Sequence, residues 1–198
     1  MKKVFLVCAM LLLCSCAGPR IVTLTEPFNE NQAKELMKPG KNTIEGSAVF
    51  RQDDGGLQNC AGRSVILVPA TKYAQERANI LYGNGSDGKI IEGVRQITTF
   101  GQYENVTLSP DIDNFHKYFK ETTCDVDGRF SFKNVADGNF FIFTEIVWQV
   151  RVNQYQQPYS YGGILMQKVN VKGGERKTVI LSPRVRYSGE ERFFYGHL

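Results

Sequence analysis

The chain has few of the side chains from which catalytic and metal centres are usually built. Histidine occurs only twice in 198 residues, as His116 and His197, and the second is the penultimate residue. A chain end is a poor place for a ligand that must be held rigidly. The sequence also lacks a C-x-x-C pair and a G-x-S-x-G nucleophile elbow. We therefore expect no catalytic residue, no bound metal and no cofactor.

The sequence also lacks any concentration of positive charge. Its 24 lysine and arginine residues are interspersed with 20 aspartate and glutamate residues, for a formal net charge of +4. A surface that binds nucleic acid normally shows in the sequence as a basic run or a clustered basic face. Because no such run is present, we expect no nucleic-acid partner.

Long apolar runs are absent too, apart from the ten residues Val4–Leu13 near the start. A run of this length is too short to cross a bilayer, which requires about 20 residues. Lys2 and Lys3 precede the run, and small residues follow it. This order of charged, apolar and small residues is the layout of a secretory signal.

The signal ends on Leu13-Cys14-Ser15-Cys16, which resembles a bacterial lipobox. That resemblance implies cleavage just before Cys16 and attachment of lipid to its thiol, so that membrane lipid anchors the mature protein in the cell envelope. Ala17, and not an aspartate, follows the cysteine. By resemblance to enterobacterial sorting signals, this implies the outer membrane.

Removal of the signal leaves Cys60 and Cys124 as the cysteines of the folded part. An even pair in an exported protein most simply forms a disulfide. The bridge would close a loop of about 64 residues and contribute about 4 kcal/mol at best by restricting the unfolded chain. Two free thiols, or a redox or metal pair, are the alternatives.

Four regions follow one another along the chain. Residues 1–15 are the signal, 16–42 the lipidated cysteine and a tether, 43–184 a single β-sandwich domain and 185–198 a C-terminal tail. The prolines and polar residues of the tether predict little structure there, apart from a short helix over Asn31–Met37.

Period-two alternation of apolar residues predicts strands through most of the domain. In the stretch Arg129–Lys133, Phe130 and Phe132 share one face, and Gly128 supplies a positive φ to the turn before it. Ser64–Val68 is a short, branched apolar run that suits a buried strand. These patterns predict an all-β fold, a Greek-key β-sandwich of about seven or eight strands. The predicted core contains Val65, Leu67, Phe130, Phe132 and Ile142.

Four motifs occur in order along this domain: Ile44–Ala48, Gly62–Thr71, Thr123–Phe132 and Val135–Ile142. Together they resemble the carboxypeptidase regulatory-like domains, which have a transthyretin-like (prealbumin-like) sandwich. The resemblance covers residues 43–182 and implies an accessory or adhesive module without an active site.

Two further features lie near the middle of the chain, a long insertion and a turn rich in aspartate. The insertion 73–118 is long for the family, and we expect a long loop that holds a short helix over Lys72–Leu81. Asp125-Val126-Asp127-Gly128 is typical of a hairpin turn. Its glycine stands fourth, whereas an EF-hand calcium loop has its glycine sixth, so turn chemistry is favoured over a metal.

Three functional hypotheses remain. The first is a lipid-anchored, non-enzymatic cell-envelope protein that binds another envelope protein or a surface polysaccharide. The second is a lipoprotein that binds a glycan or small molecule through Tyr155, Tyr159 and Tyr161 in the hairpin 153–163. The third is a metal-dependent enzyme on a transthyretin-like fold, with His116 and nearby tyrosines as ligands.

Replacement of Cys16 by serine tests the anchor. Because the cysteine thiol is the acylation site, Cys16→Ser should leave an uncleaved or soluble precursor that incorporates no labelled palmitate. Membrane fractionation and palmitate labelling measure both properties. A Cys16→Ser protein of mature size that still partitions with membranes and carries label would show that the lipobox interpretation is wrong.

Overall fold

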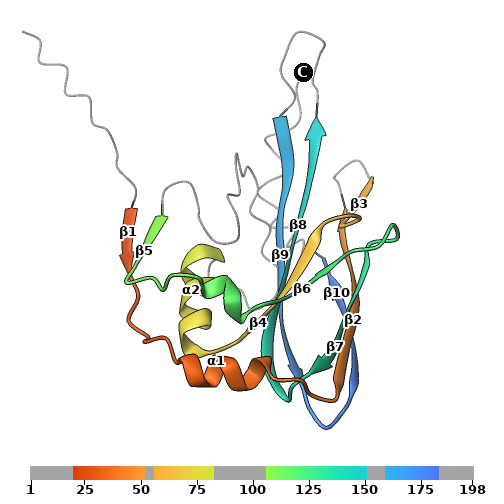
Figure 1. The fold of residues 1–198 in the computed structure, drawn as a ribbon. Coiled ribbons are helices and arrows are strands. Elements are labelled where there is room, and N and C mark those ends of the chain that lie inside the picture. Colours follow the sequence, from red (N-terminus) through yellow and green to blue (C-terminus); the bar gives the residue numbers. More distant parts are fainter. Residues whose placement is uncertain (1–19, 52–55, 83–105, 151–158, 183–198) are drawn as a thin grey trace, which may run out of the picture.

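Two β-sheets packed face to face form the body of the structure, a computed structural model that describes residues 20–51, 56–82, 106–150 and 159–182. The strands run roughly along one long axis, and two helices lie against the sandwich (Figure 1). None of the helices in these four ranges combines the length and apolarity needed to cross a bilayer.

The first sheet is built around β2 (Asn42–Arg51). This strand pairs in parallel with β10 (Arg176–Leu181) and antiparallel with β7 (Arg129–Val135). Its last three residues pair with the short strand β3 (Leu57–Asn59). The parallel β2–β10 pair brings the first and last strands of the sandwich together.

The second sheet has the strand order β6–β4–β8–β9, and all its neighbours are antiparallel. Its strands are β6 (Lys120–Thr123), β4 (Ser64–Pro69), β8 (Gly138–Val150) and β9 (Tyr159–Val171). Each of the two sheets of the sandwich has four strands, which confirms the predicted all-β sandwich and its strand number.

The main hydrophobic core fills the space between the two sheets. Alternate residues of β7 and β8 point into it, as the period-two pattern predicts. Phe130 and Phe132 are only 5% and 4% exposed, with ring centroids 6.1 Å apart. All five predicted core residues are buried in this cluster: Val65, Leu67, Phe130, Phe132 and Ile142.

The predicted disulfide joins Cys60 to Cys124, whose α-carbons are 5.7 Å apart. Both residues are buried in the core between the sheets. Cys60 follows β3 of the first sheet, and Cys124 follows β6 of the second. The bridge therefore ties the two sheets together covalently.

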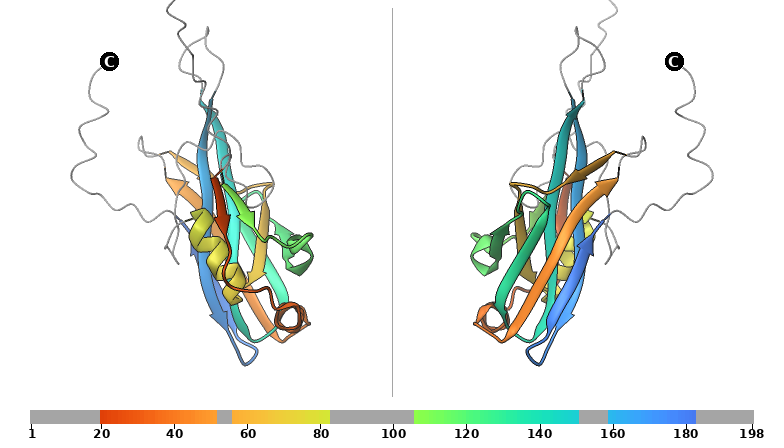
Figure 2. Two further views of the ribbon diagram at one scale, coloured as in Figure 1. Left: turned by 90° about the vertical axis from the view of Figure 1, so that its left-hand side faces the viewer. Right: turned by 90° about the vertical axis from the view of Figure 1, so that its right-hand side faces the viewer.

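The second sheet is buried on its outer face as well. Helix α2 (Lys72–Tyr82) lies over this face, as the left view of Figure 2 shows. Thr71 stands before the helix, and its Oγ1 accepts a hydrogen bond from the Ala74 N–H at 3.2 Å. The expected short helix of the insertion is thus present. The outer apolar layer contains Ile66 and Val68 of β4, Phe141 and Phe143 of β8, and Tyr73, Ala74, Ala78 and Leu81 of α2.

The region predicted to be a tether packs against this outer layer. β1 (Arg20–Thr23) pairs in parallel with β5 (Val106–Ser109) of the insertion. The predicted short helix is confirmed as α1 (Glu30–Met37). Leu24 and Ala33 are 6% and 1% exposed.

The expectation of little structure is therefore wrong for residues 20–42. The local composition is polar, but its few apolar side chains complete the cover of the sheet. Phe28 packs against the rings of Tyr73 and Phe115, at centroid distances of 5.3 and 5.8 Å. Phe115 belongs to the 3₁₀ helix η1 (Phe115–Tyr118). Tertiary packing rather than local propensity orders this segment.

A carboxylate on α2 fixes the N-terminal segment to the domain. Both oxygens of Glu76 accept hydrogen bonds from the Thr25 N–H, at 2.9 and 3.0 Å, and one accepts from the Glu26 N–H at 2.8 Å. The Thr25 hydroxyl adds a bond of 2.7 Å. The Glu26 backbone bond, and then those of Thr25, hold the pKa of Glu76 below its usual value.

One end of the sandwich, called here the Asn42 pole, is closed by hydrogen bonds. It consists of α1, the turn between β7 and β8, and the turn 172–175 between β9 and β10, at the bottom of Figure 1. The buried Asn42 side chain donates to the Val135 carbonyl at 3.0 Å and to Asp137 at 2.8 Å. Its oxygen accepts from the Gly174 and Glu175 N–H groups at 2.8 and 2.9 Å. One amide thus connects three chain segments.

Truncation of a core phenylalanine tests the packing. Phe132→Ala should lower the free energy of unfolding by about 3–5 kcal/mol, because it removes a buried ring and leaves a cavity. Ile180→Ala is the matched control, since this side chain is 62% exposed and its loss should cost little. Urea unfolding of both variants measures the difference. Equal stabilities would contradict the described core.

Glu76 gives a pH-dependent test of how the N-terminal segment is held. A carboxyl whose pKa is lowered in the folded state stabilises the protein above its unfolded pKa of about 4.3, and that stability is lost as the pH falls further. Glu76→Gln should therefore lower Tm most above about pH 5 and least near about pH 3. Glu121→Gln serves as the control, because the Glu121 side chain is exposed. A Tm difference independent of pH would contradict the assignment.

Candidate functional site

The described tyrosines of the predicted binding hairpin lie at the start of β9. Tyr159 and Tyr161 pair through their backbones with Val150 and Trp148 of β8. Tyr155, like Cys16 and the tail 185–198, lies outside the described residues. The structure therefore places the backbone of Tyr161 opposite Trp148, the single tryptophan of the chain, and the backbone of Tyr159 opposite Val150.

The β8–β9 pair extends beyond the sandwich as a two-stranded ribbon. β4 pairs with β8 only over Phe140–Thr144, whereas β9 pairs with β8 as far as Val150. The far half, Glu145–Val150 with Tyr159–Ile164, therefore has neither β4 nor β6 beside it. We call this far half the ribbon; it projects upward in Figure 1.

Contacts at its base hold the ribbon to the body. The Trp148 ring packs edge-on against Phe50 of β2, with centroids 5.0 Å apart. Arg63 Nη2 donates to the Val147 carbonyl at 3.1 Å. Gly162 allows a close strand approach, because a β-carbon there would lie 1.9 Å from the Ile146 oxygen. Burial raises the pKa of Glu145, while the nearby Arg63 acts in the opposite direction.

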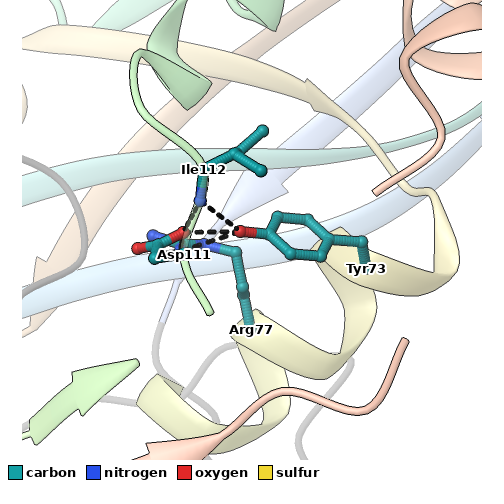
Figure 3. Close-up of polar contacts among 4 residues, drawn as sticks. All are labelled: Tyr73, Arg77, Asp111 and Ile112. Carbon is teal, nitrogen blue, oxygen red and sulfur yellow. Dashed lines mark hydrogen bonds and ion pairs between the residues drawn. The ribbon is translucent and has the colours of Figure 1, made fainter. Parts of the chain in front are cut away.

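A polar cluster that was not predicted from the sequence lies between α2 and the segment after β5. The Tyr73 hydroxyl donates to Asp111 at 2.5 Å and accepts from the Ile112 N–H at 3.2 Å (Figure 3). Arg77 forms an ion pair with the same carboxylate. Burial, followed by the bond to Asp111, raises the pKa of Tyr73. Asp111 lies 34 residues from Arg77 and 38 residues from Tyr73 in the sequence, so no local pattern could have revealed the cluster.

The cluster is a packed junction rather than a ligand site. The Arg77 side chain is only 12% exposed, and its guanidinium lies 5.0 Å from the centroid of the Phe115 ring. The adjacent cavity measures about 40 Å³ and is lined mainly by apolar side chains of α2, β4 and β8. That volume is far below the roughly 300 Å³ of a typical ligand pocket. Arg77, Asp111 and Tyr73 therefore join the insertion to α2.

His116 is exposed on η1, and the two described tyrosine hydroxyls near it have other partners. Tyr73 bonds Asp111, and the Tyr118 hydroxyl donates to Glu30 at 2.8 Å. Within the described ranges, no three side chains among His, Cys, Asp and Glu come together as a metal-binding group. His197 lies outside these ranges.

The Asp125–Gly128 turn has the predicted hairpin chemistry. Asp125 Oδ1 accepts hydrogen bonds from the Asp127 and Arg129 N–H groups, each at 2.9 Å. Gly128 has a φ of +72°. A β-carbon at Gly128 would lie 2.7 Å from Asn59, so that both its conformation and its surroundings require glycine.

Comparisons with known proteins support the fold. No protein-family model and no curated protein sequence matches the chain. Among solved structures, it is similar to a "putative carbohydrate binding protein" from Pseudomonas aeruginosa, with a TM-score of 0.60 and 22% identity. The match covers 79% of this chain and 98% of that one. At this identity the likeness concerns the fold.

A second match is to a 9R-lipoxygenase from Cyanothece, with 12% identity and a TM-score of 0.25. It covers 80% of this chain and 18% of the lipoxygenase. This likeness carries no argument about fold or function.

Proposed function

We propose that this chain is a lipid-anchored, non-enzymatic protein of the cell envelope that binds a carbohydrate polymer through the ribbon. The lipobox-like sequence before Cys16 supports the anchor. The carbohydrate role ascribed to the Pseudomonas aeruginosa protein supports a polysaccharide, rather than another envelope protein, as the partner.

The projecting ribbon is the observation that carries this proposal. Two strands alone are at best marginally stable in water, whereas three or more strands with an apolar face are stable independently. Residues 145–150 and 159–164 form such a pair beyond the reach of β4. The inner part of the ribbon packs against the body, since Ile146 and Ile164 are only 2% and 5% exposed. The outer part, with the exposed Gln149, extends past both β4 and β6, and an interaction with a partner accounts for it better than stability does.

The residues of the ribbon suit a sugar surface. Trp148 pairs through its backbone with Tyr161, and Val150 with Tyr159. Aromatic side chains combine a rigid apolar ring with a polar group, and they lose little conformational entropy on binding. A saccharide has complementary apolar faces and hydroxyl groups. A polymer would be bound along the open surface of the ribbon.

The contacts made by the ionisable side chains around His116 support the non-enzymatic part of the proposal. The described groups that could act as acids, bases or ligands near His116 take part in packing contacts instead. Tyr73, Arg77 and Asp111 join α2 to the insertion, and Tyr118 bonds Glu30 of α1. His116 itself lies on the exposed helix η1.

Removal of tyrosine rings from the ribbon tests the binding site. Tyr159→Ala with Tyr161→Ala should weaken cosedimentation of the detergent-solubilised acylated protein with purified envelope polysaccharide about tenfold, which corresponds to about 1.4 kcal/mol. The matched control, Tyr159→Phe with Tyr161→Phe, keeps both rings and should retain most of the binding.

His116→Ala tests the enzymatic hypothesis in the same assay. This variant should fold, bind the polymer and support the cellular role as the unmodified protein does. A folded His116→Ala protein that has lost its function would contradict the proposal and favour a metal-dependent enzyme. Unchanged binding by the double alanine variant would contradict the ribbon as the site.

A further inference from the structure

The ribbon leaves the second sheet at a defined point on β8. The pairing of β8 with β4 ends with Thr144 opposite Val65. The Thr144 side chain is 1% exposed, and its hydroxyl donates to the Ser64 carbonyl at 3.0 Å. We call this point the pivot, because beyond it β9 is the strand of the described chain with which β8 pairs.

Apolar packing beyond the pivot holds the ribbon to the body without fixing its angle. Ile146 and Ile164 are only 2% and 5% exposed, and the Trp148 ring packs edge-on against Phe50. Burial of apolar surface is non-directional, because its free energy depends on the area removed from water. These contacts therefore favour a docked ribbon, whereas a single orientation requires directional bonds.

Arg63 supplies a directional bond beyond the pivot. Its Nη2 donates to the Val147 carbonyl at 3.1 Å. Val147 lies three residues past Thr144, which is about 10 Å along a strand. A bond at this distance restrains rotation of the ribbon more effectively than a bond at the pivot itself. The same guanidinium lies near Glu145, where burial raises the pKa of the carboxyl and Arg63 acts in the opposite direction.

The backbone of Arg63 is held by both cysteines of the disulfide. The Arg63 N–H donates to the Cys60 carbonyl at 2.7 Å, and the Arg63 carbonyl accepts from the Cys124 N–H at 2.9 Å. Between them, Gly62 has a φ of +71°, a conformation that favours glycine, and its N–H donates to the Cys124 carbonyl at 3.1 Å. The base of the Arg63 side chain is thus fixed by the covalent link between the sheets.

A continuous path of bonds therefore runs from the core to the ribbon. It begins at the Cys60–Cys124 disulfide, passes through the backbone and side chain of Arg63 and ends at the Val147 carbonyl. Every step is a covalent bond or a hydrogen bond. Because hydrogen bonds have a preferred length and direction, such a path can hold a projecting element at one angle.

We propose that Arg63 is the positioning residue of the ribbon, which connects the Cys60–Cys124 bridge to Val147 and holds the ribbon in its binding orientation. The inference rests on the proposed binding of a carbohydrate polymer. A surface that is already ordered loses less conformational entropy when its partner binds. The contribution of Arg63 to affinity is therefore indirect.

Amide hydrogen exchange along β8 tests the positioning without any ligand. In Arg63→Gln, exchange over Glu145–Gln149 should become about fivefold faster, a typical coupling within one hydrogen-bond network. Exchange over Phe140–Thr144, which β4 pairs, should stay unchanged. Arg63→Lys keeps the charge and a donor, so it should restore slow exchange. The matched control is Arg129→Gln, because the Arg129 side chain is 71% exposed.

Two exchange results would overturn the inference. One is equal rates in Arg63→Gln and Arg129→Gln. The other is faster exchange over the whole of β8 in Arg63→Gln, since that pattern marks a general loss of stability rather than a change at the ribbon.

Removal of the bridge tests where the path begins. In protein with Cys60→Ala and Cys124→Ala, addition of Arg63→Gln should change the exchange of Glu145–Gln149 much less than about fivefold, because both changes break the same path. An undiminished effect of Arg63→Gln would overturn the bridge as the origin of the positioning. If the bridge-free protein does not fold, the comparison of Arg63→Gln with Arg63→Lys still decides the role of Arg63.

Polymer binding separates this inference from the proposed function. In the cosedimentation assay, Arg63→Gln should weaken binding about fivefold, and Arg63→Lys should retain most of it. Faster exchange of the ribbon without loss of binding would overturn the positioning role. Absence of binding by the unmodified protein would instead overturn the proposed function, and the exchange rates would still show whether Arg63 fixes the ribbon.

Discussion

The rest of the structure depends on the need to bury both faces of the β6–β4–β8–β9 sheet. Adjacent residues of β8 point to opposite sides, and both sides are apolar, with Phe140 and Ile142 inside and Phe141 and Phe143 outside. The other sheet covers the inner face. The outer face needs its own cover, because four bulky apolar positions in two neighbouring strands would otherwise meet water. α2, η1 and the N-terminal segment supply it.

This requirement explains which features the sequence could reveal. The inner core follows from alternation within single strands, so Phe130, Phe132 and Ile142 could be assigned from local pattern. The run Ser64–Val68 indicated a buried strand, but not what would cover its second face. The cover comes from Phe28, Tyr73 and Leu24, which lie far apart in the sequence among polar neighbours. No local period marks such residues, and the order of the tether was therefore missed.

The candidate site, too, has features that the sequence could reveal and features that it could not. The tyrosines of the hairpin 153–163 were visible in the sequence. That β4 ends its pairing at Thr144, leaving a projecting ribbon, depends on register between strands about 80 residues apart in the sequence. The Tyr73–Arg77–Asp111 junction likewise depends on contacts across the insertion. Pairing register and long-range ion pairs are decided by the assembled fold, so neither could be predicted from one segment.

The two ends of the sandwich are stabilised by different means, and this bears on how the ribbon can function. At the Asn42 pole, one buried amide ties short turns together by hydrogen bonds, and Leu36 of α1 packs against the core. At the opposite end, the Cys60–Cys124 bridge follows β3 and β6 and links one sheet to the other. Arg63, between Cys60 and β4, donates to the Val147 carbonyl at 3.1 Å, so the bridge lies beside the base of the ribbon. The loop 60–63 therefore couples the covalent link between the sheets to the base of the ribbon.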